Sequence, residues 1–186
     1  MIFSFSTLNW ITGLGCLFFP LLNLGARIIT KAPFSPKTYG YILKKYKVTS
    51  TLIASRSAIV MFKSADFNPD DFSAIKEMIC GGERLPSTVR NFLVPLLPKT
   101  CFTPVLGISE MNAVSSFIKD VDLSKISDNI VGGVRENGHC KIVDVDTREA
   151  LGPNKVGEIL LKSEFMFSVS FDGDYKNCKC YKRVSL

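Results

Sequence analysis

The chain has 186 residues, of which 46% are hydrophobic and 22% are charged, so it can bury the core of about one domain and is neither disordered nor fibrous. Its formal net charge is +6, but the basic residues do not gather into one long run interleaved with aromatic residues. The sequence therefore predicts no nucleic-acid partner, and the lysines between positions 37 and 47 are interpreted as a solvated helix face.

The first 26 residues carry no charge, which raises the question of a membrane or secretory segment. A signal peptide needs a basic region before its apolar run, and a spanning helix should not contain Asn9, Pro20 and Asn23. Residues 10–24 are better explained as a helix buried between a sheet and its neighbours, ending at Gly25. Membrane association is therefore the less favoured alternative.

From residue 26 to residue 106, short apolar strands alternate with helices. The expected elements are strands at 26–30, 49–54, 75–80 and 101–106, helices at 36–47, 57–62 and 86–97, and a polar turn at 67–71. Ser35 followed by Pro36 is a typical helix start, with the serine as N-cap. Strands separated by helices at this spacing predict an α/β fold, a parallel sheet with flanking helices.

The pattern changes after residue 110. Residues 139–144 and 156–162 are predicted strands that are joined by turn-forming residues with no helix between them, which predicts a small antiparallel β element. We expect an α/β subdomain over residues 1–120, an antiparallel β subdomain over 121–167 and an irregular basic tail over 168–186.

Two loops at the ends of predicted strands organise the chain. The first contains Gly81, Gly82 and Glu83, and the second runs over residues 106–110, with the sequence LGISE. Glycine lets a ligand approach the backbone, and a hydroxyl beside a carboxylate suits phosphate and a hard cation. Loops at the carboxyl ends of parallel strands form the crevice where ligands bind. We therefore predict that the two loops are facing walls of one site.

The sequence lacks several familiar catalytic motifs. It contains no P-loop, and the segment that begins at Gly107 lacks the closing glycine of a nucleophile elbow. The sole histidine, His139, lies on a predicted strand, and nothing marks it as a general base. A hydrolase or P-loop mechanism is therefore not favoured.

The motifs, taken in order, resemble the adenylate-forming superfamily. The sequence has GGERLP at 81–86, GISE at 107–110, KIVD at 141–144, LGPN at 151–154 and GEI at 157–159. Before them, WITG at 10–13, RIIT at 27–30 and PFSP at 33–36 are similar to the insect luciferase-like acyl-CoA synthetases and the 4-coumarate–CoA ligases. The similarity covers about residues 3–167 and implies part of the large N-terminal domain of such an enzyme.

The resemblance implies a two-step reaction. In these ligases a carboxylate attacks the α-phosphorus of Mg-ATP, pyrophosphate leaves, and the thiol of coenzyme A then takes the acyl group from the acyl-adenylate. The implied cofactors are ATP or AMP, Mg²⁺ and coenzyme A. The implied partner is a carboxylic acid, fatty or aryl, with a medium or long fatty acid as the default expectation.

Several roles follow from matching the nucleotide-binding motifs of the family. Gly81, Gly82 and Glu83 match the segment that borders adenine and the acyl pocket, and Gly107 matches the backbone beside the nucleotide. Leu106 stands where the family usually has an aromatic ring that stacks on adenine. Leucine can still cover the base but loses a stacking contact worth ~1 to 3 kcal/mol, so we expect a lower affinity for ATP.

Other roles concern the chemistry and the acid. Ser109 matches the hydroxyl that contacts phosphate and Glu110 the carboxylate that binds Mg²⁺, so the resemblance makes both of them candidate catalytic residues, and Glu110 the candidate metal ligand. Trp10 and Thr12 match the start of the helix that lines the acyl pocket. Ordinary core packing explains these two residues equally well.

In the family, a phosphate-gripping loop with a lysine would precede Met1, and a small domain with the catalytic lysine would follow Leu186. We therefore expect a fragment, a truncated splice product or a degenerate copy that is not a competent ligase alone. A catalytically silent nucleotide- or acyl-binding module and a membrane-associated interaction protein are the alternatives. The chain ends in VSL, which does not match a peroxisomal SKL signal, so the expected location is cytoplasmic or peroxisomal.

Overall fold

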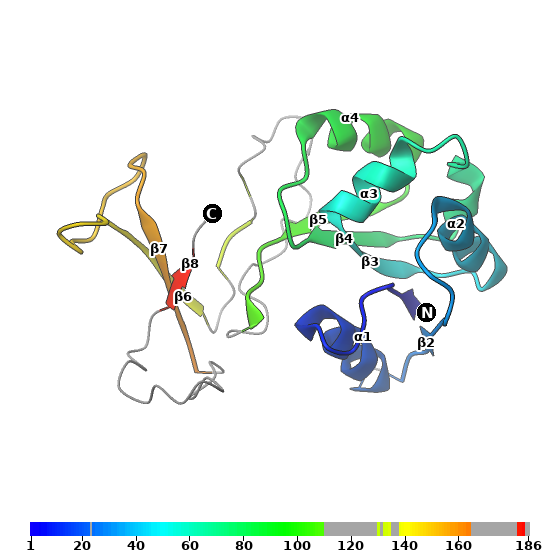
Figure 1. Ribbon diagram of the computed structural model, residues 1–186, viewed down its shortest axis with the longest axis horizontal. Helices are drawn as coiled ribbons and strands as arrows, with labels where there is room; N and C mark the ends of the chain where they lie inside the picture. The colour runs from blue at the N-terminus through cyan, green and yellow to red at the C-terminus, as the bar shows by residue number, and fades with distance from the viewer. Residues whose placement is uncertain (23, 110–129, 131, 135–137, 165–181, 185–186) are drawn as a thin grey trace. The chain divides into compact units, whose positions relative to one another are not determined.

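Five parallel strands form one sheet in the first part of the chain, in the order β2-β1-β3-β4-β5 (Figure 1). The strands are β1 Ile2–Phe3, β2 Arg27–Ile28, β3 Ser50–Ala54, β4 Glu77–Gly81 and β5 Cys101–Val105. This computed structural model describes residues 1–22, 24–109, 130, 132–134, 138–164 and 182–184. The prediction of an α/β fold with a parallel sheet and flanking helices is confirmed. The sequence did not predict β1, and β2 has only two residues where a strand over residues 26–30 was expected.

The chain divides into two units, Met1–Leu106 with Phe117–Gly132, and Gly107–Ser116 with Gly133–Leu186. The helices of the first unit are α1 Ile11–Leu22, α2 Pro36–Lys45, α3 Ser55–Phe62 and α4 Ser87–Leu96, with a 3₁₀ helix, η1, at Pro69–Phe72. Ser35 caps α2 by accepting the backbone N–H of Thr38 at 3.1 Å, as expected from its position before Pro36.

Helices α2, α3 and α4 share one apolar core with the sheet. Thr51 and Ile53 of β3 and Met78 and Cys80 of β4 alternate with half-buried neighbours, as a sheet with one well-covered face requires. Tyr39 of α2 lies at the centre of this core with 1% exposure and bonds the hydroxyl of Thr51, which donates to the carbonyl of Phe3 at 2.9 Å.

Aromatic rings close the core around Tyr39. Four phenylalanine rings lie with their centroids 5.6 to 6.3 Å from the Tyr39 ring, and they are Phe3, Phe5, Phe34 and Phe72. Burial raises the pKa of the Tyr39 phenol well above its usual range, so this hydroxyl stays neutral. The hydroxyl therefore serves as a structural hydrogen-bond donor in this core.

Helix α1 lies on the other side of the sheet from α3 and α4 (Figure 1). The prediction that this helix is buried between the sheet and its neighbours is wrong, because Trp10 is 63% exposed, Phe18 56% and Leu22 81%. Among the described elements its main contacts are with β1 and β2, which have two residues each and therefore offer little surface to cover it. None of the helices in the described ranges is long and apolar enough to cross a membrane.

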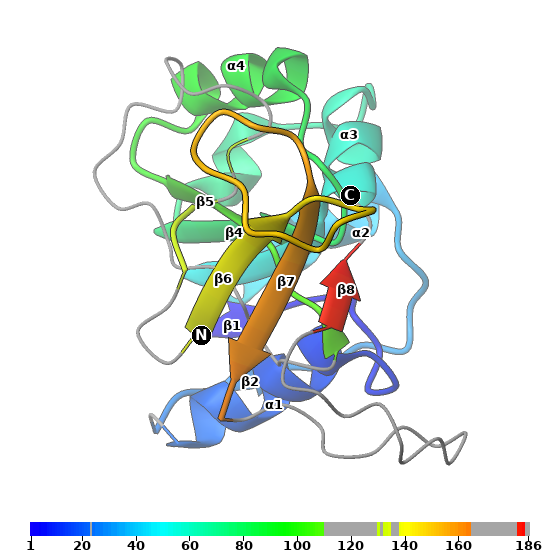
Figure 2. The ribbon, with the colours of Figure 1, turned by 90° about the vertical axis from the view of Figure 1, so that its left-hand side faces the viewer.

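The second unit contains the antiparallel sheet that the sequence predicted. Strands β6 Gly138–Val143 and β7 Glu158–Ser163 pair in antiparallel fashion, and β8 Lys182–Val184 pairs with β7 (Figure 2). Arg148 in the connection forms an ion pair with buried Glu158, with 2.5 Å between Nη1 and Oε2. Strand β8 lies in the tail for which the sequence predicted irregular structure.

Truncation of a core residue should cost far more than truncation of an exposed one. Leu93 of α4 is fully buried, so Leu93→Ala should lower the free energy of unfolding by about 2–5 kcal/mol in urea titrations. The matched control is Leu22→Ala at the exposed end of α1, which should change it by less than about 0.5 kcal/mol. Similar losses for the two variants would contradict the core described above.

Candidate functional site

The carboxyl ends of β4 and β5 lie side by side up to their last residues. Gly81 is the register partner of Val105, so the chain leaves both strands at one edge of the sheet. A Cβ atom on Gly81 would lie 2.5 Å from Cγ2 of Val105 and 3.2 Å from its carbonyl oxygen. A side chain at position 81 would therefore force Val105 to shift, which favours glycine there.

The loop after β4 presents open backbone. Gly82 has φ +86°, a conformation that favours glycine, and no atom lies within 4 Å of the place where its Cβ would be. The next residue, Glu83, is exposed, and its carbonyl accepts the hydroxyl of buried Ser55, the first residue of α3, at 2.7 Å. The loop is therefore held to α3, while Gly82 offers a surface free of side chains to a flat ligand.

A small pocket lies at these strand ends. Its lining includes Glu83 from the loop, Arg90 from α4 and Thr103 from β5, and its volume is about 30 Å³. Arg90 is 5% exposed and Thr103 2%. A cavity of this size holds water but not a nucleobase.

The second predicted loop begins beside the first. Leu106, which follows Val105 directly, is half-buried, and Gly107 and Ser109 are exposed but belong to the second unit. Glu110 lies outside the described residues. The structure therefore brings together Gly81, Gly82, Glu83 and Leu106, whereas the part that Ser109 and Glu110 take in the same site stays a prediction.

Gly82 and Ser109 offer different kinds of contact to a ligand. Gly82 offers open backbone in the first unit, and Ser109 is an exposed residue of the second unit. Within the described ranges, no three His, Cys, Asp or Glu side chains are grouped so that they could hold a metal ion. The predicted Mg²⁺ ligand, Glu110, is not among those residues.

The residues predicted to border the acid lie at the start of α1. Trp10 is largely exposed, and the Thr12 hydroxyl lies 2.5 Å from the Ser6 hydroxyl. Sequence reasoning missed Arg27, whose guanidinium bonds the carbonyls of Ser6 and Gly13. The signal that could have identified it is that Arg27 is the first charged residue of the chain, directly after 26 uncharged ones.

Comparisons with known proteins find relatives of this chain. A family model described as AMP-binding enzyme matches residues 1–170. The curated 4-coumarate–CoA ligase-like 9 of Arabidopsis thaliana is 26% identical over 143 residues, which is 76% of this chain and 25% of that protein. The luciferin 4-monooxygenase of Photuris pensylvanica is 25% identical over 150 residues, 81% of this chain and 27% of that protein.

The solved structures include a luciferase-like enzyme from the nonluminescent mealworm Zophobas morio. It is 28% identical with a TM-score of 0.79, and the match covers 89% of this chain and 40% of that one. The chain thus spans about a quarter of the length of the curated relatives it matches. Over that span the sequence and the fold are similar to those of the named proteins.

A side chain at position 81 should disturb the pairing of β4 and β5. Gly81→Ala should lower the free energy of unfolding by about 1–3 kcal/mol, because its methyl group would overlap Val105. Gly81→Ala combined with Val105→Ala should recover part of this loss relative to the sum of the single variants, as a double-mutant cycle in urea would measure. Gly152→Ala is the matched control, since a Cβ at Gly152 would meet no atom within 4 Å. Full additivity of the two changes would contradict the close contact.

The thiol beside the glycine loop should be unreactive. Cys80 precedes Gly81 and is buried, and burial raises its pKa to about 12, so the thiolate is scarce at pH 8. Iodoacetamide at pH 8 should label exposed Cys101 in the native protein and spare Cys80 until urea is added, as peptide mass spectrometry would show. Equal labelling of both thiols in the folded protein would contradict the burial of this strand end.

Proposed function

The chain belongs to the family of AMP-binding enzymes, and we propose that it forms part of a carboxylic acid–CoA ligase that makes an acyl-adenylate and then a thioester. The observation that carries the proposal is the paired end of β4 and β5, where Gly81 packs against Val105 and the next residue, Gly82, leaves its backbone open. Because the chain spans about a quarter of its curated relatives, the activity of a whole ligase is a proposal for it.

The proposed chemistry joins a carboxylic acid to AMP. A carboxylate oxygen attacks the α-phosphorus of ATP and pyrophosphate leaves; the sulfur of coenzyme A then attacks the acyl carbon, and AMP and a proton are released. The backbone at Gly82 would receive adenine, and the exposed hydroxyl of Ser109 would donate a hydrogen bond to a phosphate oxygen. Glu110 would hold Mg²⁺, which neutralises charge on the phosphate oxygens.

We propose that the acid is fatty or aryl and lies along α1. Trp10, Leu14, Phe18 and Leu22 follow one another at intervals of four residues and are all more than a third exposed, so they form one apolar stripe. A hydrocarbon chain or an aromatic ring could cover this stripe and remove it from water. The cytoplasm or the peroxisome is the proposed location of this activity.

If Ser109 contacts a phosphate group, its replacement should weaken the binding of nucleotides but not of the nucleoside. In isothermal titration calorimetry of the full chain, Ser109→Ala should weaken the binding of AMP and of Mg-ATP by about tenfold. The affinity for adenosine should not change, because only the phosphate loses a hydrogen bond. Ser73→Ala, an exposed serine next to η1, is the matched control and should change none of the three affinities.

The same titration with dodecanoate and 4-coumarate tests the acid side. Binding of AMP with either acid supports the proposed ligase site, and binding of AMP alone supports a nucleotide-binding module without an acid site. A chain that binds neither AMP nor Mg-ATP would contradict the proposed function.

A further inference from the structure

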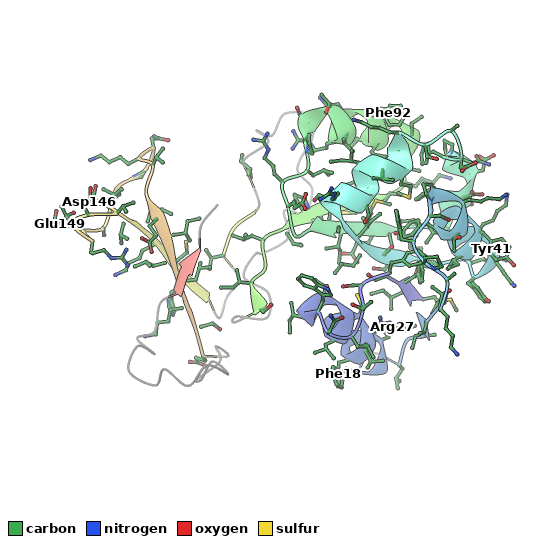
Figure 3. All side chains as sticks on the ribbon, in the orientation of Figure 1. Phe18, Arg27, Tyr41, Phe92, Asp146 and Glu149 are labelled. Atoms are coloured by element: carbon green, nitrogen blue, oxygen red, sulfur yellow. The ribbon has the colours of Figure 1, made fainter. Side chains whose placement is uncertain are left out.

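One arginine ties the edge of the sheet to the start of α1. Arg27 is the first residue of β2, where it is the register partner of Ile2 in β1. The backbone of this edge is also fixed by a hydrogen bond from the Ile2 N–H to the Ala26 carbonyl at 2.9 Å. From this anchored position the Arg27 side chain lies between β2 and α1 (Figure 3).

The guanidinium reaches two carbonyl groups that are separated in the sequence. Nη1 of Arg27 donates to the Gly13 carbonyl in the first turn of α1 at 2.6 Å, and Nη2 donates to the Ser6 carbonyl in the preceding loop at 3.5 Å. A guanidinium holds its donors in a rigid planar fork, so it can serve two acceptors at once. Arg27 thus fixes the loop and the helix start against the same strand.

The contacts of Arg27 include an unpaired donor that reduces their contribution to stability. Nε of Arg27 is buried without a hydrogen-bond partner, and no carboxylate of the described ranges forms an ion pair with the residue. The nearby thiol of Cys16 supplies no charge, since burial raises its pKa although Arg27 lowers it in part. The unpaired Nε–H offsets part of what the two hydrogen bonds contribute to stability, so the contact is better explained by the geometry it imposes.

The loop that Arg27 holds also carries the residues proposed for the acid. A Cβ on Gly13 would overlap the carbonyl oxygen of Thr7, so the helix start packs directly on the loop. The same Thr7 carbonyl accepts the N–H of Trp10 at 3.1 Å, and the Ser6 and Thr12 hydroxyls are 2.5 Å apart. Any shift of the Ser6 and Gly13 carbonyls therefore moves Trp10 and Thr12 with them.

We propose that Arg27 is a positioning residue for the acid site, which it serves by clamping the Ser6 and Gly13 carbonyls and so fixing Trp10 and Thr12. This inference rests on the proposed function only for the identity of the ligand. The placement of Trp10 can be measured without any acid, because Trp10 is the only tryptophan of the chain.

The experiment compares Arg27→Met, which keeps the length of the side chain and removes its donors, with Arg27→Lys and the control Arg56→Met on the exposed face of α3. Hydrogen exchange of the Trp10 and Gly13 amides should rise about tenfold in Arg27→Met, and the fluorescence anisotropy of Trp10 should fall, while amides of α4 stay unchanged. In calorimetry, Arg27→Met should bind dodecanoate and 4-coumarate about tenfold more weakly than the wild type. Its affinity for AMP should stay within twofold of the wild-type value.

The amide exchange rates and acid affinities of Arg27→Lys should lie between those of the wild type and Arg27→Met, because the ammonium group keeps the charge and one of the two contacts. If Arg27→Met does not fold, Arg27→Lys is compared with the wild type in its place. Unchanged exchange at Trp10 and Gly13 would overturn the inference, as would an equal loss of AMP and acid affinity. If the wild type binds AMP but neither acid, the acid part of the proposed function fails, and exchange and anisotropy decide whether Arg27 positions Trp10.

Discussion

The candidate site depends on the in-register pairing of β3, β4 and β5. Ala54 pairs with Gly81, and Gly81 pairs with Val105, so three strands finish at one edge of the sheet. Ser55 follows Ala54 directly, and its hydroxyl holds the Glu83 carbonyl. The three strand ends are therefore fixed to one another, and the open backbone of Gly82 follows directly after them.

The two faces of this sheet differ in how well they are covered. The face under α2, α3 and α4 contains the aromatic core around Tyr39, whereas Leu52 and Ile79 on the other face are only half-buried. Helix α1 packs mainly on the short strands β1 and β2, and its apolar stripe is exposed. A well-packed face supports the strand ends proposed for the nucleotide, and the exposed apolar residues proposed for the acid belong to α1 and the residue before it.

Local sequence signals predicted most elements of the first unit. Ser35 and Pro36 start α2 where expected, Asn68 caps the 3₁₀ helix in the predicted polar turn, and the glycine loop follows β4. The prediction failed for the burial of α1, because an apolar pattern shows which residues can be buried but not whether a partner surface is present. Strand β8 was missed for a related reason, since its pairing with β7 joins distant parts of the chain.

The sequence by itself determined the alternation of strands and helices, the two glycine loops and the resemblance to adenylate-forming enzymes, because these depend on residue type and local order. The tertiary structure alone decided that the contact with Val105 favours glycine at position 81, that Trp10 is exposed, and that Arg27 bonds the carbonyls of Ser6 and Gly13. Such contacts join residues far apart in the chain, and only the packing of β1, β2 and α1 brings those groups within hydrogen-bond distance.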